Sequence, residues 1–280
     1  MNNIIFTVPG CTRCKIVKDF MKEKGIAYVE KDIKAEGKEE FQQFYTANRK
    51  SIYRGAEGIE FPIFTDGNKI CQGIGPVLAY LNSGEKLAGY FSVGTLHREW
   101  VDGIHISSGN SKYADDLMSV LRYLKGNAMK LKVDTNGKHS HILQMILDNA
   151  LADNVVMNVV GPPDLYSTIL EEEVDLRDIE KTISLVPKFP EYQFQTTIVP
   201  VMRQEGEAIS YLTPEEVALA AKFIEEVTRS KKHPYLIKLF NPREAKDERL
   251  KSLEPLSPNI LFKYRTVARE YQMFAEVERE

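Results

Sequence analysis

Apolar and polar positions over residues 1–82 alternate in the manner of a small α/β unit. A short apolar run at 4–7 predicts a strand, and the next segment carries apolar residues at helical spacing, which predicts a helix. Further elements are expected as a strand at 27–30, a helix at 38–48, a strand at 60–64, a hairpin turn at 66–68 and a helix at 76–81.

From Trp100 onward, apolar runs that are typical of strands alternate with helical periods. The expected strands are 103–106, 129–133, 154–157, 192–196 and 235–239. The expected helices are 114–124, 141–150, 176–186 and 214–228. The last helix should begin with a capping box, because Thr213 precedes Pro214 and Glu216 follows in register. Strand–helix alternation indicates a mainly parallel sheet with right-handed crossovers.

The polar run 82–86 has the composition of a hinge between two domains. We therefore expect one domain at 1–84, a linker at 85–99 and a second domain at 100–280. A short strand at 90–93 is expected within the linker. At 280 residues the chain is long enough for two separate cores.

Overall composition narrows the class of protein. Hydrophobic content of 43% with 28% charged residues is typical of a soluble globular protein. The net charge of −3 gives no reason to expect nucleic acid as a partner. No apolar run of ~18 residues and no secretory signal are present, so we expect a cytoplasmic protein without a membrane partner.

The stretch Val8-Pro9-Gly10-Cys11-Thr12-Arg13-Cys14-Lys15 carries the clearest chemistry. It should form a tight turn and the first turn of a helix, where backbone N–H groups lack helical partners. These groups and the helix dipole favour a thiolate, so the pKa of Cys11 should be low. Arg13 and Lys15 add positive charge. Cys14, one turn on, should be the resolving thiol.

Two alternatives to redox chemistry remain for this pair. A Cys-x-x-Cys motif can be half of a zinc site, but the remaining cysteine is Cys71 and no His-x3-5-His pair exists, so we expect no metal. The other alternative is two buried thiols without chemistry. Three cysteines do not form a disulfide framework.

The Cys-x-x-Cys motif and the order of elements in 1–82 resemble a glutaredoxin, which implies a thioredoxin-like fold. The resemblance implies that Pro62 takes the cis form and faces the disulfide. It also implies that Gly73 and Gly75 form the turn that receives the carboxylate of glutathione. With Arg13 and Lys15, these three residues are the expected substrate-positioning groups. The loop 45–58 is longer than a minimal glutaredoxin needs.

Strand ends in the second half resemble those of radical SAM activating enzymes that serve anaerobic ribonucleotide reductase and pyruvate formate-lyase. The run Asp134-Thr135-Asn136-Gly137 matches the family's second strand end unaltered. The stretches 107–110, 158–162 and 195–197 stand where the family has its first, third and later motifs. The resemblance covers about 100–254 and implies a partial (β/α) barrel.

Departures from that family indicate that radical chemistry has been lost. No cysteine follows Cys71, so we expect no iron–sulfur cluster. Neutral residues replace charged ones at the cofactor positions, including Asn158 and Gln195. A ligand pocket is nevertheless expected at the strand ends, formed by Ser107, Asp134, Asn136, Asn158 and Gln195.

Other candidate groups have simpler explanations. His139 and His141 on a loop are expected to be solvated rather than metal ligands, and His105 to be a hydrogen-bonded strand residue. Aromatic residues near the C-terminus are expected on one helix that packs against a domain face; they are Phe262, Tyr264, Tyr271 and Phe274.

The sequence therefore predicts a thiol–disulfide oxidoreductase whose catalytic residues are Cys11 and Cys14, with no tightly bound cofactor and glutathione as a candidate reductant. Its partner would be a protein disulfide client or glutathione, and an anaerobic radical enzyme is a candidate client. The second domain would dock that client or bind a small ligand. Two alternatives stay open: a SAM- or nucleoside-binding sensor without radical chemistry, and an interaction scaffold.

Overall fold

A computed structural model describes residues 3–56, 58–203, 209–244 and 247–278. Dense internal contacts divide the chain into two compact units. Unit 1 contains residues 1–133 and 148–153, and unit 2 contains residues 134–147 and 154–280. The domain borders at residues 84 and 100 are predicted from composition and family resemblance, and they stay predictions. In the described part of the chain, no helix combines the length and the apolar character that crossing a membrane requires.

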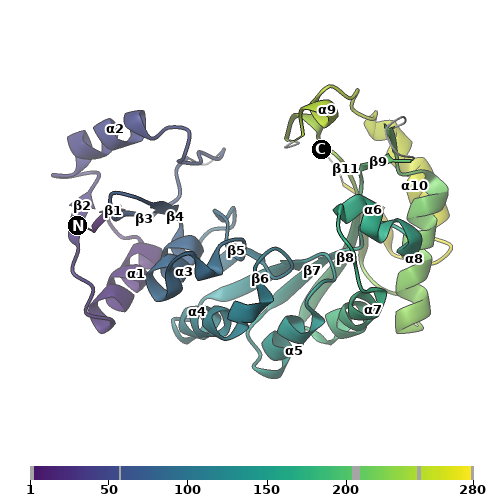
Figure 1. The fold of residues 1–280 in the computed structure, drawn as a ribbon, viewed down its shortest axis with the longest axis horizontal. Coiled ribbons are helices and arrows are strands. Elements are labelled where there is room, and N and C mark those ends of the chain that lie inside the picture. The colour runs from purple at the N-terminus through teal and green to yellow at the C-terminus, as the bar shows by residue number, and fades with distance from the viewer. Residues whose placement is uncertain (1–2, 57, 204–208, 245–246, 279–280) are drawn as a thin grey trace. The chain divides into compact units, whose positions relative to one another are not determined.

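Unit 1 begins with a four-stranded mixed sheet of order β2-β1-β3-β4 (Figure 1). Its strands are β1 (Ile4–Thr7), β2 (Val29–Asp32), β3 (Ile63–Thr65) and β4 (Ile70–Gln72). β1 runs parallel to β2 and antiparallel to β3, and β3 pairs antiparallel with β4. This mixed topology confirms the predicted thioredoxin-like sheet.

Three helices cover this sheet, namely α1 (Thr12–Glu23), α2 (Lys38–Ala47) and α3 (Ile74–Ser83). Successive side chains of β1 point to opposite faces. Phe6 packs against Phe41 and Phe44 of α2, with ring centroids 5.2 and 4.8 Å apart. Ile5 pairs in register with Phe64, whose ring lies 6.0 Å from that of Tyr80 on α3. Different helices therefore cover the two faces of the sheet.

The segment predicted as a linker packs within unit 1. Leu87 and Tyr90 are buried, and the predicted strand at 90–93 is reduced to an isolated antiparallel bridge between Phe91 and Ile104. Two backbone hydrogen bonds hold it, from Ser92 N to Gly103 O and from His105 N to Tyr90 O. Residues 90–92 are therefore fixed against β5 (Trp100–His105).

Helix α4 (Ala114–Gly126) packs on the thioredoxin-like part of unit 1. The ring of Tyr123 meets Phe20 of α1 edge-on at 4.8 Å, and the hydroxyl of Ser83 at the end of α3 donates to Asp116. These contacts explain why residues beyond 84 belong to the same compact unit.

Unit 2 is built on parallel strands β7 (Asn154–Asn158), β8 (Glu191–Ile198), β11 (Tyr235–Leu239) and β12 (Ala275–Val277). β8 pairs in parallel with both β7 and β11, and β11 pairs in parallel with β12. With β5 and β6 (Lys130–Thr135), the larger sheet has the order β12-β11-β8-β7-β6-β5. The parallel sheet with its crossover helices confirms the predicted α/β partial barrel.

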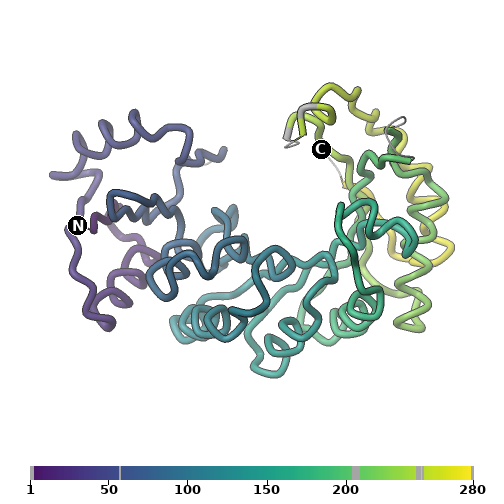
Figure 2. Tube along the Cα trace, in the orientation of Figure 1, coloured from purple at the N-terminus to yellow at the C-terminus, as the bar shows by residue number. Residues whose placement is uncertain are grey.

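The helices of unit 2 follow its strands along the chain. They are α5 (Ser140–Asp148), α6 (Tyr166–Leu170), α7 (Leu176–Leu185), α8 (Pro214–Thr228), α9 (Glu248–Lys251) and α10 (Leu261–Ala268). The predicted start of α8 is confirmed, because Thr213 and Glu216 form a reciprocal capping box. Figure 2 shows α8 and α10 side by side, and Tyr264 of α10 donates to Leu212 O just before α8.

Several short elements in the described part of unit 2 escaped prediction, including α6 and α9, and two of them are strand features. One is a hairpin of β9 (Pro200–Met202) and β10 (Ile209–Tyr211). The other is edge strand β12.

The expectation of one packed C-terminal helix was wrong in part. α10 ends at Ala268, so Tyr271 and Phe274 lie beyond it, and Phe262 and Phe274 are exposed. Only Tyr264 of the four aromatic residues is buried. The chain leaves the helix because the buried Gln272 accepts from His233 N, and β12 then pairs with β11.

Candidate active site

Cys11 is the residue that caps α1. Gly10, with a positive φ of 73°, makes the sharp turn after β1 that the sequence predicts. Cys11 then takes an extended conformation, and its Sγ accepts a hydrogen bond from Cys14 N at 3.0 Å. A sulfur in this position receives one of the N–H groups that a helix start leaves unpaired. The same N–H group and the helix dipole stabilise negative charge on the sulfur once the bond is reduced.

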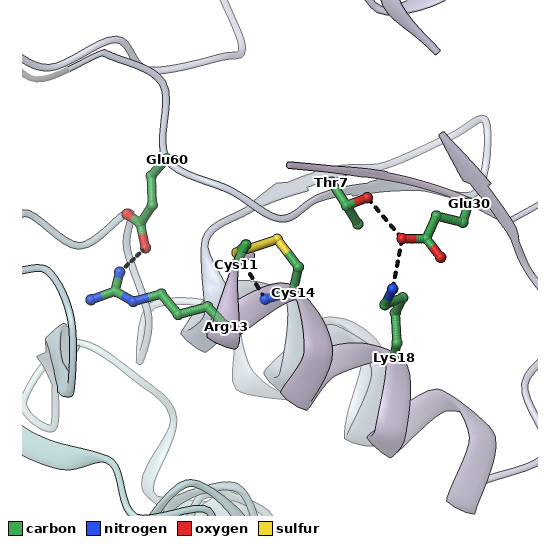
Figure 3. The surroundings of a disulfide bond; sticks show 7 residues. All are labelled: Thr7, Cys11, Arg13, Cys14, Lys18, Glu30 and Glu60. Atoms are coloured by element: carbon green, nitrogen blue, oxygen red, sulfur yellow. Dashed lines mark hydrogen bonds and ion pairs between the residues drawn. A yellow bond between two sulfur atoms is a disulfide. The ribbon is translucent and has the colours of Figure 1, made fainter. Parts of the chain in front are cut away.

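Cys11 and Cys14 form a disulfide, with Cα atoms 5.3 Å apart (Figure 3). Cys14 is buried, with 2% of its surface exposed, whereas Cys11 is partly exposed. An incoming disulfide can therefore reach the sulfur of Cys11 but not that of Cys14. The difference in access agrees with an attacking role for Cys11 and a resolving role for Cys14.

The third cysteine is not part of this site. Cys71 lies in β4, is buried and makes no disulfide. Burial raises the pKa of its thiol to about 12. Cys71 is therefore a protonated core residue at neutral pH.

Arg13 and Lys15, predicted together, lie in different environments. Lys15 is exposed on α1. Arg13 is buried, and its guanidinium binds the carboxylate of Glu60 at 2.7 Å and the carbonyl oxygens of Leu96 and Trp100. Arg13 thus ties the start of α1 to the chain at 96–100, and its charge is largely neutralised by Glu60.

Glu60 is the site residue that the sequence reasoning missed. Its side chain is 10% exposed, and its Oε2 is buried with no hydrogen-bond partner among the described residues. Burial raises the pKa of this carboxyl above its ordinary value, and Arg13 opposes that rise. An acidic residue two positions before the predicted cis-proline was the available signal.

The peptide bond between Phe61 and Pro62 is cis, as the glutaredoxin resemblance implies. Pro62 is buried at the start of β3, and its carbonyl accepts from Gly73 N at 2.9 Å. This bond joins the proline turn to the turn before α3.

Gly73 and Gly75, predicted to receive glutathione, lie against side chains of this chain. Gly73 has a φ of +84°, and a Cβ there would lie 2.9 Å from Glu60 Oε1. A Cβ at Gly75 would lie 2.9 Å from the ring of Phe91. Both glycines therefore allow a carboxylate and an aromatic ring to approach the start of α3.

A second carboxylate fixes the segment next to Glu60. Asp102 accepts hydrogen bonds from Thr95 N at 2.9 Å, Thr95 Oγ1 at 2.7 Å and Leu96 N at 3.0 Å. Burial alone would raise the pKa of Asp102, but these hydrogen bonds hold it below its ordinary value. Asp102 is therefore an ionised anchor for residues 94–96.

The disulfide opens onto a cavity of about 1000 Å³ within unit 1. Its walls come from four segments of the chain: 8–13, 53–61, 94–99 and 127–129. Cys11, Arg13 and Glu60 are among the lining residues. The site therefore combines an accessible sulfur with room for a sizeable substrate.

The residues predicted as a second pocket are divided between the two units. Asn158 and Gln195 are register partners on β7 and β8, so their side chains share one face of the sheet. Asn158 Oδ1 is buried and has no hydrogen-bond partner. Asp134 and Asn136 lie at the end of β6, where the side chain of Asn136 accepts from Lys138 N at 3.3 Å. Ser107 is buried and belongs to unit 1, whereas the other four belong to unit 2.

The cysteines of this chain are not arranged to hold an iron–sulfur cluster. The activating-enzyme resemblance implies a [4Fe–4S] cluster, which requires several thiolates. Cys11 and Cys14 are bonded to each other, and Cys71 is buried in a different strand. Among the described residues, no group of three or more His, Cys, Asp or Glu side chains is arranged to hold a metal.

Comparisons with known proteins separate the two halves of the chain. The glutaredoxin family model matches residues 3–51. A protein of Methanocaldococcus jannaschii, named as a glycyl-radical enzyme activating enzyme, is 28% identical over 178 residues, which cover 61% of this chain and 68% of the relative.

A solved structure also matches. It is a domain of a pyruvate-formate lyase-activating enzyme from Bacteroides vulgatus, with a TM-score of 0.44 and 14% identity, covering 64% of this chain and 100% of that domain. The N-terminal part of this chain is thus a glutaredoxin domain with a Cys-x-x-Cys disulfide, and a large part of the chain is similar to a glycyl-radical enzyme activating enzyme.

Proposed function

We propose that the protein is a thiol–disulfide oxidoreductase that acts through Cys11 and Cys14. The observation that carries this proposal is the hydrogen bond from Cys14 N to the partly exposed Sγ of Cys11 at the start of α1. The same N–H group stabilises the thiolate that reduction would release.

The proposed reaction proceeds in two exchanges. The Cys11 thiolate attacks one sulfur of the substrate disulfide, which forms a mixed disulfide and releases the other sulfur as a thiolate. Cys14 then loses its proton to solvent and attacks the Cys11 sulfur, which releases the second substrate thiolate. The substrate gains two electrons, and the Cys11–Cys14 disulfide remains to be reduced by a thiol reductant.

Glutathione is the first reductant to test, and the cytoplasm, a reducing compartment, is the location that this chemistry favours. For the client we propose a glycyl-radical enzyme, since the Methanocaldococcus relative bears the name of an activating enzyme for that class.

Turnover of a small disulfide tests the central proposal. Cys11→Ser should reduce the turnover of hydroxyethyl disulfide to the background rate, because the attacking sulfur is gone. Cys14→Ser should accumulate the mixed disulfide at Cys11, visible by mass spectrometry under non-reducing conditions. Unchanged turnover in the Cys11→Ser variant would contradict the proposal.

For unit 2 we propose a role in holding the client or a small ligand. The buried, unpaired Oδ1 of Asn158 beside Gln195 supports a polar ligand that donates a hydrogen bond. S-adenosylmethionine and adenosine should each be titrated by calorimetry against the native protein and Asn158→Leu. Binding that the variant loses supports the ligand role, and no binding to either protein favours docking of a client.

A further inference from the structure

The cavity at Cys11 is larger than the exchange of one disulfide requires. Its volume of about 1000 Å³ lies at the upper end of the range for pockets that enclose drug-sized molecules. Much of its wall lies outside the segment 3–51 that matches the glutaredoxin model, in the stretches 53–61, 94–99 and 127–129. These added walls indicate a substrate that extends well beyond the sulfur atoms.

The walls present backbone and apolar surface. Glycines at 10, 55, 58 and 94 contribute to the lining, together with apolar residues such as Ile59 and Met129. Gly55 N donates to Gly58 O at 2.9 Å, and Gly58 N donates to Gly55 O at 3.1 Å, so two backbone hydrogen bonds hold these two glycines together. A wall of accessible backbone and apolar side chains is complementary to an extended polypeptide, whose own amides and side chains alternate.

Among the described residues of the cavity lining, one arginine has no ion pair. The two described carboxylates of the lining each have a cation nearby: Glu60 binds Arg13, and Glu99 lies 3.9 Å from Lys130 Nζ. Arg98 lines the cavity and is exposed, with no ion pair to any described residue.

A second cation lies next to the lining residues, though not among them. Arg54 is exposed between the lining residues Tyr53 and Gly55, and it also has no ion pair within the described parts of the chain. With Arg98, it gives two exposed arginines in or next to the lining that have no ion pair to a described residue.

We propose that the cavity binds an extended, cysteine-bearing polypeptide segment with acidic residues next to its cysteine. Arg54 and Arg98 attract and pair with those acidic residues, while the backbone and apolar walls hold the segment so that its disulfide reaches Cys11. This inference rests on the proposed function, since it names the substrate class of the same site.

Three synthetic peptide disulfides test the inference. They are symmetric disulfides of capped pentapeptides with cysteine in the centre, flanked on both sides by glutamate, by glutamine or by lysine. The second-order rate constant for oxidation of the reduced protein is measured for each at low ionic strength. The glutamate peptide should react at least about tenfold faster than the lysine peptide, and ~1 M salt should remove most of this difference.

Charge-reversal variants assign the effect to the two arginines. Arg54→Glu combined with Arg98→Glu should reverse the order of the glutamate and lysine peptides. The control Lys22→Glu combined with Lys34→Glu makes the same change in net charge at exposed positions outside the cavity lining, and it should keep the native order. The role of the arginines would be overturned if the native protein reacted equally fast with the glutamate and lysine peptides. It would also be overturned if the control variant changed the ratio of the two rate constants as much as the arginine variant does.

Hydroxyethyl disulfide, which is neutral and small, separates this inference from the proposed function. Its Cys11-dependent reaction with the native protein measures the disulfide exchange alone, and the glutamine peptide should react with the native protein about tenfold faster than it does. A glutamine peptide no faster than hydroxyethyl disulfide would overturn the polypeptide inference alone. Absence of any Cys11-dependent reaction would remove the proposed function, and this inference with it.

Discussion

Arg13 Nη1 lies 2.7 Å from Glu60 Oε1, and both side chains are only 10% exposed. This ion pair joins the first turn of α1, which carries the disulfide, to the chain just before the cis-proline. Arg13 Nη2 also donates hydrogen bonds to the carbonyl oxygens of Leu96 and Trp100. One buried cation therefore holds together three of the segments that surround Cys11.

Breaking this pair should strongly destabilise unit 1. Arg13→Ala leaves the Glu60 carboxylate buried without its cation, a change that typically costs about 3–5 kcal/mol. Urea unfolding followed by fluorescence of the single tryptophan, Trp100, measures the loss. Lys69→Ala is the matched control, because it breaks an exposed pair with Glu85 and should cost under about 1 kcal/mol. Equal losses in the two variants would contradict a structural role for the buried pair.

Glu60 should also give stability a characteristic dependence on pH. Its pKa in the folded protein is raised above the ordinary 4.5, so the folded state binds the proton more tightly than the unfolded state. The associated stabilisation is complete below pH 4.5 and is lost as pH rises through the folded pKa. The free energy of unfolding of the native protein, relative to Glu60→Gln, should therefore fall as pH rises above 4.5. A difference that is constant or grows over this range would show that the pKa is not raised.

Features set by neighbouring residues could be predicted from the sequence. The turn at Gly10 and the cap at Cys11 depend on residues within one helical turn, and α8 begins and ends where its capping box and periodicity indicate. The cis bond before Pro62 followed from the family resemblance.

Features that depend on distant contacts could not be predicted. Glu60 and Arg13 are 47 residues apart, and no local pattern distinguishes this glutamate from a solvated one. The contacts of Asp102 and Arg13 with the backbone of residues 95 and 96 also join positions with no local pattern in common. Strand β12 has only three residues, too few to show an alternating pattern.

Alkylation should distinguish the three cysteines of the reduced protein. Iodoacetamide at pH 7 should modify Cys11 first, because only its sulfur is both accessible and stabilised as a thiolate. Cys71 should stay unmodified in the folded protein, since burial raises its pKa to about 12, and should react once the chain is denatured. Peptide mass spectrometry after timed quenching reports each site. Modification of Cys71 as early as Cys11 would contradict the assignment.

Loss of the Asp102 anchor should weaken substrate binding more than chemistry. Asp102→Ala removes the acceptor of three hydrogen bonds from residues 95 and 96, so the wall at 94–99 should loosen. The KM for the acidic peptide disulfide should rise about tenfold, with kcat changed by less than about twofold. Lys125→Ala is the control, because it breaks the Lys125–Asp153 pair in the same unit and should leave KM unchanged. A fall in kcat at constant KM would place Asp102 in the chemical step instead.

Phe91 should limit the use of glutathione. Its ring lies so close to Gly75 that a Cβ at that glycine would be 2.9 Å from it, at the turn where the family resemblance predicts that glutathione binds. Phe91→Ala should uncover the N–H groups at the start of α3, which favour a carboxylate. Reduction of the oxidised protein by glutathione should then become about tenfold faster, while reduction by dithiothreitol, which has no carboxylate, stays within about twofold. Phe262→Ala, which removes an exposed phenylalanine of unit 2, is the control for loss of an aromatic side chain. If Phe91→Ala accelerates both reductants equally, the ring restricts access to the disulfide in general, and recognition of the glutathione carboxylate at Gly75 is contradicted.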